Sequence, residues 1–76
     1  MVDEVARIVG ARIRDLREKT GMSLRGFAEH GGLNYNVLSR IERGEQNLTL
    51  ATLFKIAGLL KTTPARLLRG LPASLS

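Results

Sequence analysis

Apolar residues recur every three or four positions along most of this chain, which is the spacing of one face of a helix. Between Met1 and Thr20 this pattern predicts a first amphipathic helix, with Asp3 as its N-terminal cap. The apolar positions of this helix are Val5, Val9, Ile13 and Leu16. No segment of the sequence has the apolar-polar alternation of a strand, so we expect an all-α protein.

Two short helices joined by a tight turn are predicted between Ser23 and Gly44. Ser23 and Asn34 are suitable N-terminal caps for them, and the glycines at 31 and 32 end the first helix. The positions expected to face inward are Phe27, Ala28, Leu33, Leu38 and Ile41. Because so short a connection does not allow the two helices to lie antiparallel, they must cross steeply. This is the helix-turn-helix arrangement.

Two more helices complete the predicted fold. Thr49 begins the fourth helix, and Thr63 with Pro64 begins the fifth, which Gly70 ends. The fourth helix has an apolar stripe that is wider than covering the motif requires, formed by Leu50, Leu53, Phe54, Ala57 and Leu60, with Ile56 beside it. In the fifth helix, Leu67 and Leu68 are expected to face inward. We therefore expect one compact five-helix domain over residues 1–70 and a short tail over residues 71–76. A chain of this size buries only about 60% of its unfolded surface, so its core is modest.

The chain is basic, with 12 Lys and Arg against 7 Asp and Glu and a net charge of +5. Most of the basic residues are arginine, which suits both phosphate groups and the edge of guanine. A basic surface attracts nucleic-acid backbones. Charge alone fits a basic protein without a nucleic-acid partner equally well. The case for nucleic-acid binding therefore depends on the helix-turn-helix motif.

The segment from Ser23 to Gly44 resembles the helix-turn-helix of the phage-repressor/Cro (XRE-type) family. Its most specific part is LSRIERG at Leu38–Gly44, followed by a polar stretch and another amphipathic helix. The resemblance extends from about Val9 to Leu68. It implies a lambda-repressor-like fold and DNA binding, with the second helix of the motif as the reading helix.

Two positions in the first helix of the motif depart from the family. Many members have a phosphate-contacting glutamine where this chain has Leu24, and a capping glutamate where it has Gly26. Phosphate contacts are therefore expected from the N–H groups at the start of this helix or from Arg25. Gly26 indicates either a locally soft helix or a close neighbour that needs the space.

Polar side chains gather at the N-terminal turns of the second motif helix, the part that can enter a major groove. Asparagine matches the N6 and N7 atoms of adenine, and arginine matches O6 and N7 of guanine. Tyrosine can stack on a thymine methyl group or bond a phosphate. The expected base-reading residues are Asn34, Tyr35, Asn36, Ser39 and Arg40.

The phosphate contacts are expected on both sides of the reading helix. The family resemblance implies that the loop after this helix follows the DNA backbone, where a negative Glu45 would oppose the approach. The expected phosphate-binding residues are Ser23, Arg25, Arg43, Gln46 and Asn47. The resemblance also implies that Glu42 is structural, paired with Arg12 or Arg17 of the first helix.

One short helix offers few base contacts, each worth about 1–3 kcal/mol, and these are too few to select one operator in a genome. A second copy would double them, with half-sites about one DNA turn apart. The expected dimer interface is apolar surface of the last two helices, with Phe54, Leu59, Leu60, Leu67 and Leu71 as contributors. The predicted function is a repressor or controller that reads a palindromic operator as a homodimer, similar to controller proteins of restriction–modification systems.

The alternative is an antitoxin or adaptor module whose main partner is another protein. A toxin and RNA polymerase are the candidate protein partners, and the sign of regulation stays open. An effector is not expected, because no pocket is evident from the sequence.

Catalysis, metal binding and membrane insertion are not expected. The single histidine, His30, lies near a helix end, and the chain has no cysteine for a zinc site, a thiol nucleophile or a disulfide. No cofactor is therefore expected. No apolar run approaches the ~20 residues of a membrane span. The N-terminus is acidic where a signal peptide would be basic, which favours the cytoplasm. The expected DNA binding would place the protein on the nucleoid.

Overall fold

The computed structural model describes residues 4–71, which form five helices and no strand. The helices are α1 (Glu4–Lys19), α2 (Leu24–Gly31), α3 (Tyr35–Glu42), α4 (Leu50–Leu59) and α5 (Pro64–Leu67). The all-α prediction is therefore confirmed. The predicted cap Asp3 and all of the predicted tail except Leu71 lie outside the described residues.

The four other predicted caps are confirmed. The side-chain oxygens of Ser23, Asn34, Thr49 and Thr63 each accept a hydrogen bond from the backbone N–H three residues later, at 3.0–3.1 Å. These bonds satisfy N–H groups that have no partner inside their own helix. Local sequence rules therefore set where α2, α3, α4 and α5 begin.

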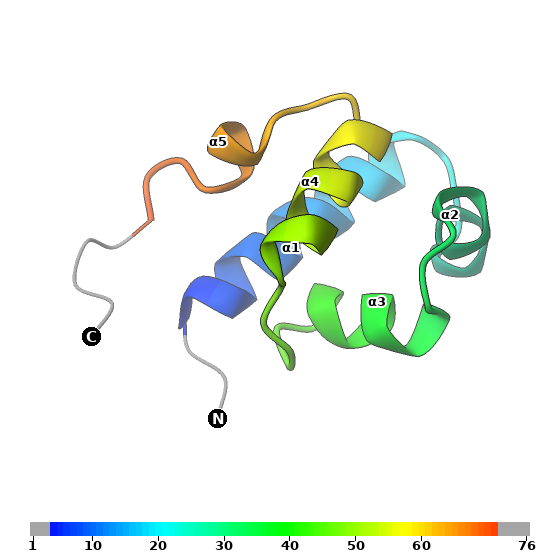
Figure 1. The fold of residues 1–76 in the computed structure, drawn as a ribbon, viewed down its shortest axis with the longest axis horizontal. Coiled ribbons are helices and arrows are strands. Elements are labelled where there is room, and N and C mark those ends of the chain that lie inside the picture. The colour runs from blue at the N-terminus through cyan, green and yellow to red at the C-terminus, as the bar shows by residue number, and fades with distance from the viewer. Residues whose placement is uncertain (1–3, 72–76) are drawn as a thin grey trace.

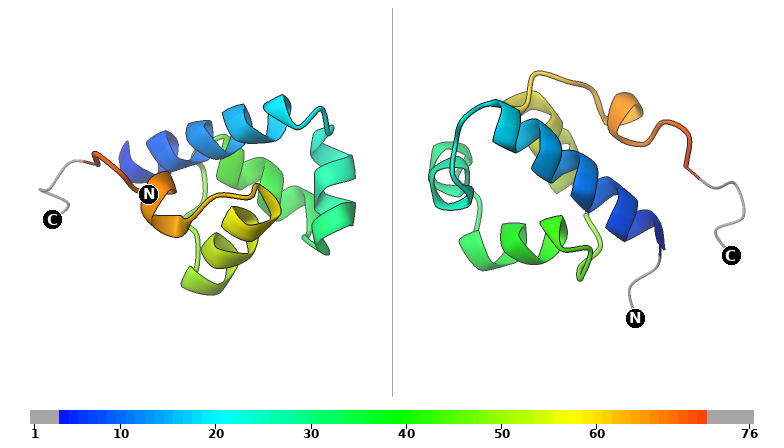
Figure 2. Two further views of the ribbon diagram at one scale, coloured as in Figure 1. Left: turned by 90° about the horizontal axis from the view of Figure 1, so that it is seen from above. Right: turned by 180° about the vertical axis from the view of Figure 1, so that it is seen from behind.

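The helices surround one core (Figure 1). α1 and α4 cover it from opposite sides, α3 closes one edge, and α2 crosses α3 steeply (Figure 2). α3 packs against both α1 and α2. Each helix contributes one large and fully buried side chain: Ile13, Phe27, Leu38, Ile56 and Leu67. α3, the predicted reading helix, is thus held by the core as a whole.

α1 and α3 approach so closely that Gly10 has to be a glycine. A Cβ atom at this position would collide with the backbone carbonyl oxygen of Ile41. A second close approach lies just after α3, where Gly44 has a φ of 72° and a Cβ atom would come within 2.7 Å of the Arg7 Cα. The C-terminal end of α3 is therefore fitted against α1 over a full turn of helix.

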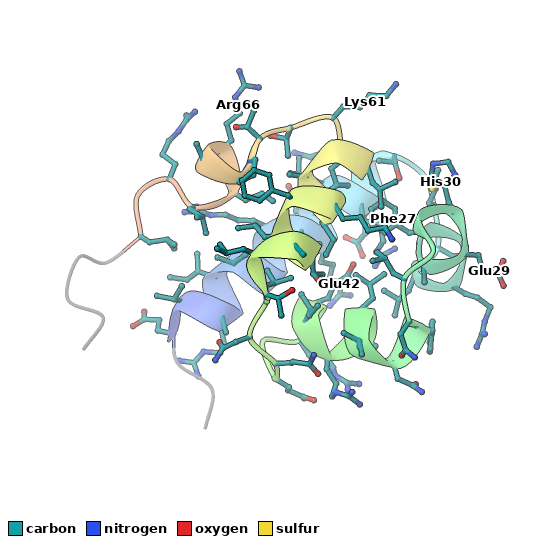
Figure 3. All side chains as sticks on the ribbon, viewed as in Figure 1. Phe27, Glu29, His30, Glu42, Lys61 and Arg66 are labelled. Atoms are coloured by element: carbon teal, nitrogen blue, oxygen red, sulfur yellow. The ribbon has the colours of Figure 1, made fainter. Side chains whose placement is uncertain are left out.

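A buried ion pair also joins these two helices. Arg17 of α1 donates from Nε to Oε2 of Glu42 at 2.7 Å and from Nη2 to Oε1 at 3.0 Å. Glu42 points from α3 into the space between the helices (Figure 3). The expectation that Glu42 is structural is confirmed, with Arg17 as its partner, whereas Arg12 donates to the carbonyl oxygen of Leu67.

Three apolar predictions are wrong. Leu68, expected to face inward, follows the short helix α5 and is 40% exposed, because α5 ends at Leu67 and not at Gly70. Leu60 and Leu67, expected in a dimer interface, are only 9% and 1% exposed. The core of the single chain already uses these two leucines, so a second copy cannot reach them.

Candidate nucleic-acid interface

The outer face of α3 carries the predicted base-reading residues. Asn34, Tyr35, Asn36 and Arg40 are exposed and Ser39 is half-buried. Leu38, Ile41 and Glu42 are buried on the opposite side of the same helix. The structure therefore gathers these polar side chains on one surface, as the helical spacing predicted.

Arg25 of α2 stacks on the ring of Tyr35 at the start of α3. The guanidinium carbon lies 4.4 Å from the centre of the ring, a cation–π contact. This contact brings a predicted phosphate-binding residue beside a predicted base-reading residue. The plane of a stacked guanidinium still presents N–H groups at its edge, where an anion can bind.

A hydrogen bond forms a similar link at the other end of the reading face. Arg40 donates from Nε to Oε1 of Gln46 at 2.9 Å, and Gln46 lies in the loop between α3 and α4. This contact again joins a predicted base-reading residue to a predicted phosphate-binding residue. The sequence placed each of the four residues in a role, but neither link is visible in the spacing.

The two cap residues at this surface keep hydrogen-bond donors. Ser23 Oγ accepts from the N–H of Gly26, and Asn34 Oδ1 accepts from the N–H of Val37. The hydroxyl proton of serine and the two amide protons of asparagine are not used by these caps. Both residues can therefore cap a helix and donate to DNA.

Gly26 has no tightly packed partner from another helix. The nearest atom to a Cβ atom at this position is the cap oxygen of Ser23, at 3.1 Å. The sequence left two explanations for Gly26, a locally soft helix or a close neighbour that needs the space. The only close neighbour among the described residues is the Ser23 cap of the same helix.

Arg43 and Glu45 form an exposed ion pair, with 3.1 Å between Nη2 and Oε1. Such surface pairs contribute about 0–1 kcal/mol and give way readily to a stronger partner. Glu45 was expected to oppose a phosphate contact, and it partly neutralises Arg43 here. Asn47, the last predicted phosphate donor, is exposed in the same loop.

Positive charge is not limited to this face. Lys61 and Arg66 project from the side of the molecule opposite α3 (Figure 3). The net charge therefore does not by itself point to the reading surface, and these two residues offer charge-matched control positions.

Apolar surface remains on α4 and α5. Leu50 and Phe54, one turn apart on α4, are 74% and 62% exposed, whereas Leu59 and Leu71 are half-buried. Leu50 and Phe54 both belong to the apolar stripe predicted for this helix, which is wider than the core-facing side requires. The side of α4 that faces the core is decided by the packing of Leu53, Ile56 and Ala57.

An open pocket of about 370 Å³ lies between α3 and α4. Leu38, Ile41 and Ile56 form its apolar floor, and Lys55 lies at its edge. This pocket could not be predicted from the sequence, because it forms only where α3 and the turn before it pack beside α4.

Other kinds of site have little support in the described part of the chain. Residues 4–71 contain no group of three or more His, Cys, Asp or Glu that could hold a metal ion. His30 projects outward from α2 (Figure 3) and is exposed. Within the same residues, no helix has the length and apolar character needed to cross a membrane.

Sequence comparison with known proteins finds a matching family and two relatives. The helix-turn-helix family model HTH_3 matches residues 13–67. The transcriptional regulator SutR of Escherichia coli K12 is 39% identical over 56 residues, which cover 74% of this chain and 32% of SutR. This chain thus spans about a third of the length of that relative. The control protein C.SmaI of Serratia marcescens is 32% identical over 65 residues, covering 86% of this chain and 77% of C.SmaI.

Solved structures also match. The restriction–modification controller protein C.AhdI of Aeromonas hydrophila has a TM-score of 0.76 and 32% identity, covering 82% of this chain and 94% of that protein. SinR, a master regulator of biofilm formation solved in complex with DNA, has a TM-score of 0.75 and 36% identity, covering 79% of this chain and 97% of the solved chain. A SinR–SinI protein complex matches with a TM-score of 0.77 and 33% identity, covering 86% of this chain and 68% of the solved chain. The chain belongs to the HTH_3 (XRE-type) helix-turn-helix family of DNA-binding transcriptional regulators.

Proposed function

We propose that this protein regulates transcription by reading a palindromic operator in double-stranded DNA as a homodimer. The observation that carries the proposal is the continuity of the α3 surface. Its base-reading candidates are flanked by Arg25 at one end, 4.4 Å from the Tyr35 ring, and by Gln46 at the other, bonded to Arg40. A groove-binding helix with phosphate donors at both ends matches the way in which such motifs dock on DNA.

The chemistry of this surface divides into two parts. Arg25, Arg43, Ser23, Gln46 and Asn47 are proposed to bind phosphates, which sets the position and register of the protein without selecting a sequence. The reading is assigned to Asn34, Tyr35, Asn36, Ser39 and Arg40. Asparagine selects adenine and arginine selects guanine through paired hydrogen bonds in the major groove.

The homodimer is proposed to form through α4 and α5. Leu50 and Phe54 expose apolar side chains that the single chain does not bury, and exposed apolar patches often mark interaction surfaces. Leu71 is half-buried, whereas Leu60 and Leu67 belong to the core and have no part in this patch. Leu59 lies on another side of α4, where it packs against Gly31 of α2. A two-fold axis through this surface would present two copies of α3 to successive turns of the major groove.

The proposed location is the cytoplasm, on the nucleoid. A controller or repressor role is supported by the names of two relatives, the control protein C.SmaI and the controller C.AhdI. The alternative, an antitoxin or adaptor with a protein as its main partner, is supported by the similarity to SinR in its complex with SinI. In that alternative, the exposed apolar surface of α4 would bind the other protein.

Selection from random duplex DNA tests the proposal, followed by titration of the selected duplex at two salt concentrations. We expect an enriched two-fold site with half-sites about one DNA turn apart. The Tyr35→Ala and Arg40→Ala variants should each lose about five- to 150-fold in affinity for that site, as expected for contacts of about 1–3 kcal/mol.

Arg66→Ala is the matched control, because it removes one positive charge from the side opposite α3. It should retain the sequence preference. Steep salt dependence without any enriched site would contradict the proposal and favour the protein-partner alternative.

A further inference from the structure

The turn that ends α3 brings the following loop back over the reading helix. The N–H of Glu45 donates to the carbonyl oxygen of Arg40 at 2.8 Å, and the N–H of Gly44 donates to that of Ile41 at 3.0 Å. With Gly44 at a φ of 72°, these two bonds form the Schellman arrangement of a helix C-terminus. The residue that follows, Gln46, therefore leaves the helix end along a defined path.

α1 supports this turn from behind. A Cβ atom at Gly44 would lie 2.6 Å from the Arg7 Cγ and 2.7 Å from the Arg7 Cα, so the loop backbone packs directly on α1. The loop cannot move toward α1, and the two backbone bonds keep it attached to α3. Gln46 is thus anchored by the fold, although its side chain lies at the surface.

The hydrogen bond between Arg40 and Gln46 has only one possible polarity. A guanidinium group has donors and no acceptor, so the amide of Gln46 must present its oxygen to Arg40 Nε, at 2.9 Å. The two N–H bonds of the amide nitrogen of Gln46 then remain for another acceptor. On the arginine, the two terminal Nη groups remain, and these can form the paired contact to O6 and N7 of guanine.

We propose that Gln46 is a positioning residue for sequence reading. It holds the Arg40 guanidinium by Nε so that its Nη groups meet a guanine, and its own amide N–H groups bind the adjacent phosphate. One side chain thereby couples a base contact to the DNA backbone. The inference rests on the proposed function, because it requires that Arg40 reads a base.

Two substitutions at Gln46 separate the two halves of this role. Gln46→Met keeps the length of the side chain and removes both the acceptor and the donors. Gln46→Glu keeps an acceptor for Arg40 Nε and loses the donors for phosphate. If Gln46 made only a phosphate contact, both variants would keep the sequence preference. If Gln46 positions Arg40, Gln46→Met should lower the preference and Gln46→Glu should keep it.

The experiment compares two duplexes: the site selected by the unmodified protein, and the same site with its preferred guanine pair replaced. For Gln46→Met we expect the ratio of the two affinities to fall about two- to tenfold, the value of one hydrogen bond. For Gln46→Glu we expect the ratio to be retained while the affinities for both duplexes fall. Melting curves of all variants check that the fold is unchanged, as expected for a surface residue.

A double-variant comparison shows whether Gln46 acts through Arg40. Arg40→Ala alone should abolish the guanine preference, and adding Gln46→Met should then weaken both duplexes equally. If Gln46→Met keeps the full preference while Arg40→Ala loses it, the inference is wrong and the proposed function stands. If Arg40→Ala also keeps the full preference, the inference is wrong together with the assignment of Arg40 as a base-reading residue. If the unmodified protein enriches no site at all, both are wrong.

Discussion

Arg17 and Glu42 lie 25 positions apart in the sequence and form a two-bonded ion pair, with side chains that are 9% and 5% exposed. Arg17 also donates from Nη1 to the carbonyl oxygen of Met22 at 2.8 Å. One side chain of α1 thus holds both the end of α3 and the segment that leads into α2. Arg17 therefore joins both helices of the motif to α1.

Replacing Glu42 with alanine should destabilise the protein strongly. Arg17 would remain buried without its partner, and breaking a buried pair in this way costs about 3–5 kcal/mol. That is a large part of the about 5–15 kcal/mol that stabilises a typical domain. Urea unfolding followed by circular dichroism measures the change.

The exposed pair Arg14–Glu18 provides the control. Its side chains are 61% and 55% exposed, so Glu18→Ala should cost less than about 1 kcal/mol. Similar losses for Glu18→Ala and Glu42→Ala would show that burial of the Arg17–Glu42 pair has no energetic consequence.

The contribution of the same pair should not vary with pH in the neutral and moderately alkaline range. The hydrogen bond to Glu42 raises the pKa of Arg17 above its ordinary value, against the opposing effect of burial. Because the folded-state pKa is the higher one, the stabilisation is fully present below the unfolded-state pKa. It is lost only as the pH rises through the folded-state pKa, far above neutrality.

The measurement is the difference in unfolding free energy between the unmodified protein and Glu42→Ala, at several pH values between 7 and 10. We expect a constant difference. A difference that shrinks steadily over this range would mean that Arg17 loses its proton there.

Replacing Arg25 should weaken DNA binding in a way that separates its charge from its stacking. Arg25→Ala removes a phosphate contact and should lower the slope of log affinity against log salt by about 1. Arg25→Lys keeps the charge, and therefore most of the slope. It loses the planar group that stacks on Tyr35 at 4.4 Å, so affinity should still fall.

Titrations of the selected duplex at several salt concentrations give both quantities. Arg69→Ala, at an exposed position after α5, is the charge-matched control and should leave the slope nearly unchanged. Equal slopes for Arg25→Ala and the unmodified protein would exclude Arg25 from the phosphate contacts.

Replacing Phe54 with glutamate should break the proposed homodimer into monomers. The side chain is 62% exposed in the single chain, so a charge there should be tolerated by the fold and repelled by an apolar partner surface. Sedimentation velocity over a range of protein concentrations detects the shift. Melting curves verify that the monomer remains folded.

Leu67→Ala is the contrasting variant, because Leu67 is 1% exposed and belongs to the core. It should lower the unfolding free energy by about 2–5 kcal/mol. If Phe54→Glu remains a dimer, the exposed face of α4 is not part of the dimer interface.

The helix starts were predictable because a cap is a local device. Ser23, Asn34, Thr49 and Thr63 each need only a backbone N–H three residues away, and the sequence alone specifies that spacing. The outward position of Tyr35, Asn36 and Arg40 followed in the same way, since it depends on the helix period and on Leu38 and Ile41 facing inward.

The choice between Arg12 and Arg17 for Glu42 could not be made from the sequence. Both arginines lie on α1, and which one meets α3 depends on where the two helices cross. Gly10 sets that crossing, because its missing side chain admits the backbone of Ile41. Leu60 and Leu67 were included in the expected dimer interface for a related reason: an apolar residue at helical spacing fits a core and an interface equally well.

The sequence by itself determined the five helices, the caps of α2 to α5, the helix-turn-helix motif and the polar residues on the outer face of α3, because these depend on local spacing and residue chemistry. Only the tertiary structure decided which leucines form the core and that Arg17 is the partner of Glu42. It also decided that Arg25 contacts Tyr35 and that Gln46 contacts Arg40. Those contacts join different segments of the chain, and their distances are set only when the helices pack together.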